Sequence, residues 1–448
     1  MLPTLMQIQL ARLTAKYSHP VPRYTSYPSA LQFGPHITPT VVEGWLKNLP
    51  TTHPVSLYLH LPYCKKLCLY CGCNMKVTHN PAVISSYMGY LLDEIRHTAR
   101  LLGQRLNVST VHLGGGTPSY CPPEDLKTLF ATLHQHFNIL PHAELSLEAD
   151  PRLLTPETVA TLASVGITRA SLGVQDTNPA VQAAIGRVQP HATNHAAVAN
   201  LRAVGIQAIN IDVVYGLPLQ TSATFTQTIA DVLELAPSRL ALFGYAHVPW
   251  MKKHQLVLEQ HPRPNPLERL NLFAAATEQL MAAGYVPVGL DHFAKPDDPL
   301  AIAAAHGTLH RNFMGYTSDD APTLLGFGAS SISTFPQGYA QNETDIPAYQ
   351  TTIAAGSLAT VKGLAFTERD TLRAPLIESL ICNLHTTLPA DVLAEALPKL
   401  EPLIADGLAT LAESTLRITP QGRPFSRVVA ACLDDYLKPT STRHSQAV

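Results

Sequence analysis

Four of the seven cysteines of this 448-residue chain fall within ten positions, at Cys64, Cys68, Cys71 and Cys73. They come directly after the apolar run SLYLHL (56–61), which has the composition of a buried strand. Thiolates are soft ligands that select zinc and iron–sulfur clusters. The pattern therefore predicts a metal centre in a loop that follows a strand.

The spacing Cys64-x3-Cys68-x2-Cys71 favours an iron–sulfur cluster over zinc. Structural zinc sites usually take four ligands from two separated pairs, and no second pair follows here. The spacing also differs from those of ferredoxins. Three thiolates can ligate three irons of a four-iron, four-sulfur cluster and leave the fourth iron open. Cys73 either closes that position or lies beside it as a non-ligand, and the spacing leaves both possibilities open.

Strand-like and helix-like patterns alternate around this loop, from about residue 55 to residue 285. The strand-like runs are 55–61, 110–113, 143–148, 169–175, 208–216 and 239–247. The helix-like runs are 87–103, 123–137, 156–167, 195–206, 225–237 and 267–285. Six consecutive β/α units predict an α/β fold with a parallel sheet and right-handed crossovers. Because eight units would close a barrel, we predict an open, incomplete (β/α)6 barrel.

Polar residues fall at the carboxyl ends of the predicted strands. In β/α barrels this rim carries the chemistry, so we expect these side chains to meet at one site. They are the four cysteines, the GGGTP run (114–118), Glu148, Gln175, Asp212 and the run 245–247.

The chain divides into three predicted parts. Residues 1–54 form an N-terminal segment that covers the substrate, 55–365 the catalytic domain, and 366–448 a small, mainly helical, winged-helix-like domain. Winged helices often bind DNA, but 366–448 contains 8 Lys and Arg against 10 Asp and Glu. We therefore expect no nucleic-acid binding. We expect this part to pack against the barrel and its last ten residues to be disordered.

The composition indicates an intracellular protein. The chain has a formal net charge of −2, no signal peptide and no apolar run long enough to span a membrane. We expect a cytoplasmic location, where reducing conditions favour metal-bound cysteines over disulfides. The twenty histidines are scattered, which indicates surface or packing roles.

The CxxxCxxC loop, with Tyr70 inside it, resembles that of the radical S-adenosylmethionine (SAM) superfamily. The resemblance implies that Cys64, Cys68 and Cys71 hold a [4Fe–4S] cluster whose open iron is chelated by SAM. An electron from the reduced cluster would then cleave SAM to methionine and a 5′-deoxyadenosyl radical. Cys73 would not be a ligand, because a fourth thiolate would occupy the position of SAM.

The same resemblance implies roles for the polar rim in SAM binding. Gly115, Gly116 and Thr117 resemble the loop that meets the amino group of the methionine moiety. Glu148 and Gln175 would bind ribose and amino donors, and Arg187 the methionine carboxylate. The remaining residues implied in cofactor binding are Tyr58 beside the sulfonium, Tyr70, Asp212, Ala246 and Ile332.

Longer motifs resemble the family of oxygen-independent coproporphyrinogen III oxidases over nearly the full length. They are PRYTSYP (22–28), CGCN (71–74), HLGGGTP (112–118), IGRVQP (185–190), INIDVVYGLP (209–218), HFAKPDDPL (292–300), LHRNF (309–313) and YAQN (339–342). The resemblance implies that two of the four propionates of coproporphyrinogen III are oxidatively decarboxylated to vinyl groups, giving protoporphyrinogen IX in haem biosynthesis. It implies a small electron-donor protein of the flavodoxin type, an unknown electron acceptor, and a monomer.

The expected catalytic residues are Tyr58, Cys73 and Arg23. Arg23 is a candidate partner for a propionate, and His310 and Arg311 are weaker candidates. Met314 departs from the glutamine that the family usually has after HRNF, which puts a second SAM site near Ile332 in doubt.

Two alternatives remain. A haem-carrying chaperone would share the cysteine loop, but such relatives typically lack PRYTSYP and the fourth cysteine. A non-catalytic, zinc-stabilised binding protein would be colourless, whereas an iron–sulfur protein would be brown and oxygen-sensitive.

Overall fold

Six parallel strands form the centre of the fold. The structure is a computed structural model that describes residues 5–437. The strands pair in the order β1-β4-β5-β6-β7-β8, as six β/α units require. Their bounds are β1 (Val55–Leu61), β4 (Asn107–Gly115), β5 (Asn138–Ala149), β6 (Arg169–Gln175), β7 (Ala208–Tyr215) and β8 (Arg239–Gly244).

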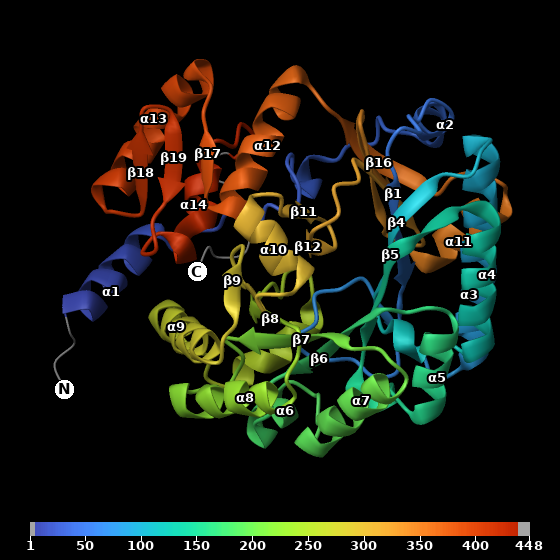
Figure 1. Ribbon diagram of the computed structural model, residues 1–448, viewed down its shortest axis with the longest axis horizontal. Coiled ribbons are helices and arrows are strands. Elements are labelled where there is room, and N and C mark those ends of the chain that lie inside the picture. The colour runs from blue at the N-terminus through green and yellow to red at the C-terminus, as the bar shows by residue number, and fades with distance from the viewer. Residues whose placement is uncertain (1–4, 438–448) are drawn as a thin grey trace.

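Helices from the crossovers cover the outer side of this sheet (Figure 1). Several begin with proline in the first turn, where the missing N–H costs nothing, and α3 ends at Gly103 in a left-handed conformation. They are α3 (Pro81–Leu102), α4 (Pro123–His136), α5 (Pro156–Ser164), α6 (Pro179–Ala184), α7 (His191–Ala203), α8 (Ser222–Glu234) and α9 (Pro266–Ala282).

The sheet does not close, which confirms the prediction of an open barrel, but it is larger than the sequence pattern indicated. It has 12 strands, and β16 and β9 are its two edges. The region 286–365, beyond the predicted β/α units, adds short strands whose length gives little periodic signal. They are β9 (Val286–Val288), β10 (His292–Ala294), β13 (Thr323–Phe327), β14 (Ile332–Phe335), β15 (Gly338–Asn342) and β16 (Thr360–Ala365).

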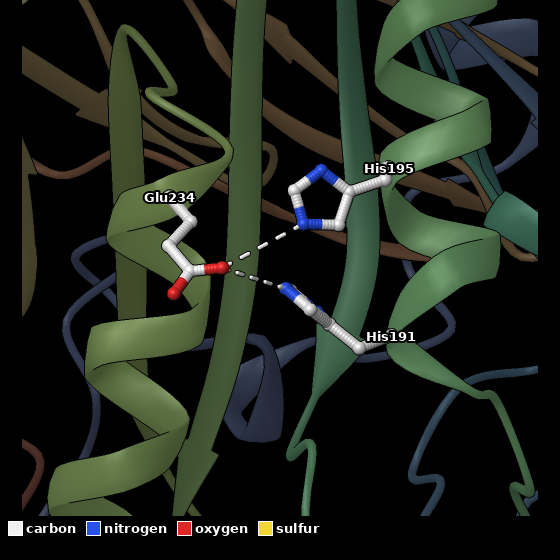
Figure 2. A group of neighbouring side chains, drawn as sticks. All are labelled: His191, His195 and Glu234. Carbon is white, nitrogen blue, oxygen red and sulfur yellow. Dashed lines mark ion pairs between the residues drawn. The ribbon is translucent and has the colours of Figure 1, made fainter.

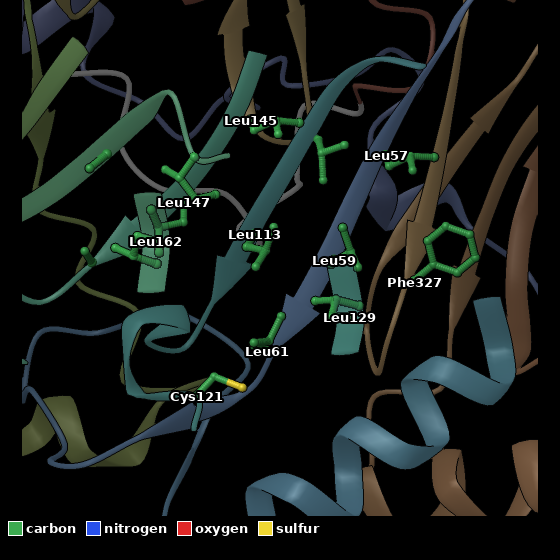
Figure 3. Packing of buried hydrophobic residues seen from close by; sticks show 14 of the residues in the cluster. Leu57, Leu59, Leu61, Leu113, Cys121, Leu129, Leu145, Leu147, Leu162 and Phe327 are labelled. Atoms are coloured by element: carbon green, nitrogen blue, oxygen red, sulfur yellow. The ribbon is translucent and has the colours of Figure 1, made fainter. Parts of the chain in front are cut away.

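Strand β1 sends alternate side chains to two different environments. Leu57, Leu59 and Leu61 are buried in the main core, among leucines from neighbouring strands and helices (Figure 3). Tyr58 and His60 point to the other side, where their side chains hydrogen-bond to each other. The alternating leucines thus pack β1 against the helices, and the rings of Tyr58 and His60 lie in the barrel interior.

The N-terminal and C-terminal parts share a second core. Helix α1 (Leu5–Tyr17), which the sequence analysis did not predict, lies against the C-terminal part, and its Lys16 and Tyr17 side chains both contact Asp406. The C-terminal elements are α12 (Glu368–Asn383), β17 (His385–Thr387), α13 (Ala390–Ala405), β18 (Ala409–Ala412), β19 (Thr415–Ile418) and α14 (Ser426–Ala431).

The remaining elements are short. They are α2 (Pro39–Lys47), β2 (Tyr63–Cys64), β3 (Lys76–Val77), α10 (Pro299–His306), β11 (His310–Asn312), β12 (Gly315–Thr317) and α11 (Ile346–Ala354). Across residues 5–437, no helix has the length and apolarity that a membrane crossing requires. The expected disorder of the last ten residues lies outside the described residues.

Candidate active site

The cysteine loop follows β1 and is held from several directions. Strand β2 pairs with β3 on one side of it. The Thr117 hydroxyl donates to Cys64 Sγ (3.2 Å), and the Arg187 guanidinium donates to Cys68 Sγ (3.4 Å). Cys64 and Cys68 are buried, whereas Cys71 is half-buried and Cys73 is exposed.

The sulfurs of this loop are farther apart than the ligands of a single zinc ion. A zinc ion with Zn–S bonds of 2.3 Å would hold tetrahedral thiolates about 3.8 Å apart. Among the sulfurs of Cys64, Cys68 and Cys71, all within the described residues 5–437, at least one pair is more than 4.8 Å apart. The hydrogen bond from Cys73 lowers the pKa of the Cys71 thiol to about 7, which favours the thiolate. We find no support for the zinc-stabilised alternative.

The GGG run brings backbone against the start of the cysteine loop. Gly115 has a φ of +109°, and a Cβ added there would lie 2.4 Å from the His60 ring. A Cβ on Gly116 would lie 2.7 Å from the backbone nitrogen of Tyr63. Glycine is required at both positions because no side chain fits, and the run therefore packs directly beside Thr117 and the cysteines.

Replacing Gly115 by alanine is expected to lower the thermal unfolding midpoint and to weaken SAM binding at least tenfold. The added methyl group must displace the His60 ring and hold a backbone conformation that L-residues avoid. Gly103→Ala is the matched control, because Gly103 also has a positive φ (+68°) but open space around it. Calorimetry and equilibrium dialysis of cluster-loaded protein check this; equal SAM affinity in both variants would contradict it.

Tyr58 and His60 form a chain of hydrogen bonds with the cysteine loop. His60 Nε2 lies 2.9 Å from the carbonyl oxygen of Asn74, and His60 Nδ1 lies 2.9 Å from the Tyr58 hydroxyl. Because a carbonyl only accepts, Nε2 carries the proton and the Tyr58 hydroxyl donates to Nδ1. The Tyr58 ring also stacks on His112 at an interplanar angle of 15°. These contacts fix the ring of Tyr58 in the middle of β1.

Two carboxylates, on β5 and β7, lie on the interior of the sheet. Glu148 accepts from the Gly115 N–H (3.1 Å), and contacts with His112 and Gly115 outweigh burial and keep its pKa below the usual value. Asp212 accepts from Ser171 (3.0 Å), and burial together with the charge of Glu148 raises its pKa to about 6. The two groups are near enough for their charges to repel. The pKa of Glu148 is lowered, whereas the pKa of Asp212 is raised.

Gln175 is the last residue of β6, and Arg187, which follows α6, contacts both β6 and the cysteine loop. The Arg187 guanidinium donates to the Gly173 carbonyl (2.5 Å) and lies 3.4 Å from Asp150. Its Nε is buried and has no hydrogen-bond partner. Gln175 is buried with a φ of +71°, an unusual conformation for a side-chain-bearing residue. An unpaired donor beside Cys68 is the feature expected of a site that takes a carboxylate ligand.

Beside the carboxyl ends of β7 and β8 lies a cavity of about 660 Å³ whose wall is rich in arginine. Six arginines line it against two carboxylates, Asp291 and Glu259, an excess of four positive charges. Buried nitrogens of Arg269 and Arg311 have no hydrogen-bond partner. The six are Arg23, Arg263, Arg269, Arg311, Arg423 and Arg427.

The sequence analysis found only part of this wall. It named Arg23, which donates to the Gly244 carbonyl (3.1 Å), and gave Arg311 less weight. The other four arginines belong to no sequence motif. Arg263 lies in a loop, Arg269 in α9, and Arg423 and Arg427 in the C-terminal part. Ala246 also lines the cavity, whereas His310 lines a separate one of about 360 Å³ and pairs with Glu378 (3.3 Å).

The other predicted residues lie at the edges of the site. The Tyr70 carbonyl accepts from Gln255 (2.9 Å), in the segment that follows β8. Ile332 begins β14 and lies against Gly326, which pairs with Tyr58 of β1. Met314 lies in the turn between β11 and β12, where its N–H donates to Asn312 (2.9 Å).

This arrangement has counterparts among known proteins. The Radical SAM superfamily profile matches residues 58–232. The solved coproporphyrinogen III oxidase of Escherichia coli, whose description calls it a radical SAM enzyme, superimposes with a TM-score of 0.89 at 38% identity, covering 93% of this chain and 98% of that one. The oxygen-independent coproporphyrinogen III oxidase of Bradyrhizobium diazoefficiens is 44% identical over 96% of this chain and 97% of its own.

The chain belongs to the oxygen-independent coproporphyrinogen III oxidase family. The enzyme of that name from Paracoccus denitrificans is 39% identical over 99% of both chains. Members of this radical SAM family use a [4Fe–4S] cluster and SAM, as the cysteine loop predicts, and the chain is an oxidoreductase. The comparisons give no support to the haem-chaperone alternative.

Proposed function

We propose that this enzyme converts two propionate side chains of coproporphyrinogen III to vinyl groups. Each conversion removes the carboxylate as CO2 and one hydrogen from the β-carbon, and the two electrons released pass to SAM and to an acceptor. The single observation that carries the substrate assignment is the arginine-lined cavity beside the carboxyl ends of β7 and β8. Its excess of four positive charges complements the four carboxylates of the substrate.

The residues at the cysteine end of the site are proposed to hold the cofactors. Cys64, Cys68 and Cys71 ligate the cluster, and the unpaired Nε of Arg187 meets the SAM carboxylate. When bound, SAM and the cluster supply the radical that removes the β-hydrogen. Tyr58, held by His60 and His112, orients the reacting groups and excludes water on the substrate side.

Glu148, Gln175 and Asp212 complete the proposed cofactor pocket with Tyr70, Gly115, Gly116, Thr117, Ala246 and Ile332. Glu148 retains its negative charge and accepts donor groups of SAM. Asp212, with a pKa of about 6, is more readily protonated and faces the adenosine. Cys73 is proposed to act beside the cluster as a non-ligand, because its backbone N–H donates to Cys71 Sγ (3.4 Å).

A binding measurement tests the substrate assignment without catalysis. Coproporphyrin III, the stable oxidised analogue, is expected to quench protein fluorescence with micromolar affinity, whereas its tetramethyl ester binds at least tenfold more weakly. The ester keeps the macrocycle but removes the four charges that pair with arginine. Equal binding of acid and ester would contradict a cavity built for carboxylates.

The N-terminal and C-terminal parts are proposed to cover the substrate, since both supply cavity arginines. Arg427 of α14 donates to the carbonyls of Val21 and Pro22 and so joins the two segments over the cavity.

One chain supplies all the proposed site residues, which supports a functional monomer. The seven cysteines form no disulfide, which supports a reducing compartment such as the cytoplasm.

A surface for the electron donor is proposed around the cysteine loop. Lys65, Lys66 and Lys76 are exposed, and the segment 56–80 that contains them has no carboxylate. Lys252 and His254, after β8, hydrogen-bond to the carbonyls of Cys73 and Cys71 (2.8 Å each). Exposed apolar side chains lie on the neighbouring segments: Val77, Val188, Met251, Leu256 and Val257. A basic rim with apolar contacts suits a small acidic flavodoxin-type donor.

The double variant Lys65→Glu/Lys66→Glu is expected to slow cluster reduction by an acidic flavodoxin about tenfold or more at low salt. Reduction by dithionite, a small molecule that needs no protein docking, is expected to be unchanged. Lys127→Glu, on the exposed face of α4, is the control. Stopped-flow bleaching of the cluster measures both rates, and an equal slowing with both reductants would contradict the docking surface.

A further inference from the structure

A second metal-binding arrangement lies outside the active site, on the outer side of the barrel. His191 and His195 are one helical turn apart on α7, so both imidazoles project from the same face. Glu234, the last residue of α8, faces them from the next crossover (Figure 2). We propose that these three residues form a binding site for a divalent transition-metal ion, of which Zn²⁺ is the best match.

The three donor atoms converge on one point. Glu234 Oε2 lies 3.7 Å from His191 Nε2 and 3.8 Å from His195 Nε2. All three lie within 4.8 Å of one another. A tetrahedral zinc ion with ligand bonds of about 2.0 Å holds its ligands about 3.3 Å apart. Each carboxylate–imidazole distance therefore needs to shorten by only a few tenths of an ångström for both pairs to fit a zinc ion.

The present contacts leave these groups unsatisfied. Separations of 3.7 and 3.8 Å are too long for hydrogen bonds. Both ring nitrogens of His191 are buried from solvent and have no hydrogen-bond partner. Buried polar atoms without partners are costly, and metal coordination would satisfy one of these nitrogens. The side chains of His195 and Glu234 are 48% and 63% exposed, so they can adjust without disturbing the core.

The ligand chemistry determines the class of ion. Two imidazoles and one carboxylate suit Zn²⁺, with water in the fourth position, and do not suit Mg²⁺ or Ca²⁺, which prefer oxygen ligands. The partial negative charge at the carboxyl end of α8 also favours a cation beside Glu234. A bound ion would link α7, the helix that follows β6, to α8, the helix that follows β7. His191 lies four residues after Arg187 in the sequence. The expected consequence is a higher thermal unfolding midpoint with Zn²⁺ than without it.

The site is tested by titrating the cluster-loaded enzyme with Zn²⁺ under anaerobic conditions and measuring the heat of binding by calorimetry. In this form of the enzyme the cysteines of the loop are occupied by the cluster. We expect one Zn²⁺ per chain with micromolar affinity, unchanged in His134→Ala, which removes an exposed helical histidine elsewhere. His195→Ala and Glu234→Gln are each expected to bind at least tenfold more weakly. His195→Cys, which keeps a ligand, should retain binding and the thermal shift. Equal affinity in wild type and His195→Ala, or no binding by wild type, would overturn the proposal.

Discussion

The Cys68→Ala variant is expected to hold no [4Fe–4S] cluster after anaerobic reconstitution and to have no detectable decarboxylase activity. Cys68 is one of three thiols proposed to ligate separate irons, and its sulfur is already held by Arg187 (3.4 Å). Two remaining thiolates cannot fix the cluster in the orientation that leaves one iron open. Iron and sulfide analysis, with the visible absorbance of the reconstituted protein, measures the loss.

Cys73→Ala is the matched control for this prediction. It removes a thiol only five residues away, but one that is exposed and proposed not to be a ligand. We expect four irons per chain in Cys73→Ala and a slower reaction, because the side-chain hydrogen bond between Cys73 and Cys71 is lost. A variant that cannot be reconstituted would show that Cys73 is a ligand and would contradict the assignment.

Arg311→Gln is expected to lower kcat/KM for coproporphyrinogen III by about 10- to 150-fold, the value of one lost charge-assisted hydrogen bond to a carboxylate. Arg311 is a cavity residue with two buried nitrogens that have no partner, and it stacks over Tyr316 at 4.3 Å. Arg23→Gln is expected to have an effect of the same order. Anaerobic initial rates over a range of substrate concentrations provide the measurement.

SAM binding separates this effect from general damage to the fold. The cavity arginines lie on the substrate side, so both variants are expected to bind SAM as the wild type does. Arg96→Gln, which removes an exposed guanidinium paired with Asp93 on α3, is the charge-matched control and should leave kcat/KM unchanged. Unaltered kcat/KM in both Arg311→Gln and Arg23→Gln would show that the propionates bind elsewhere.

The sequence predicted the parts of the fold and site that depend on local pattern. Strands β1 and β6 have the bounds that their apolar runs indicated, because a strand buried on both faces reads as a continuous apolar segment. The cysteine loop, the GGG run, Glu148 and Asp212 were found because strand ends in parallel sheets meet at one rim. The structure brings the GGG run and Glu148 together beside Tyr58, whereas Ala246 lines the arginine-rich cavity.

The parts that were missed depend on contacts between distant segments. Arg263, Arg269, Arg423 and Arg427 gather around one cavity only after the C-terminal part packs against residues near Val21. No spacing in the sequence links them. The short strands between 286 and 365 gave little signal, because runs of three to six residues are too brief to show a period.

The central claim is that this chain decarboxylates coproporphyrinogen III by radical SAM chemistry. Its most direct test is one anaerobic incubation of the reconstituted enzyme with a reductant, SAM, an electron acceptor and coproporphyrinogen III, followed by mass spectrometry. The account predicts two successive losses of CO2 with two hydrogens each, and the appearance of 5′-deoxyadenosine. Intact porphyrinogen, from protein shown to hold its cluster and to bind SAM, would contradict it.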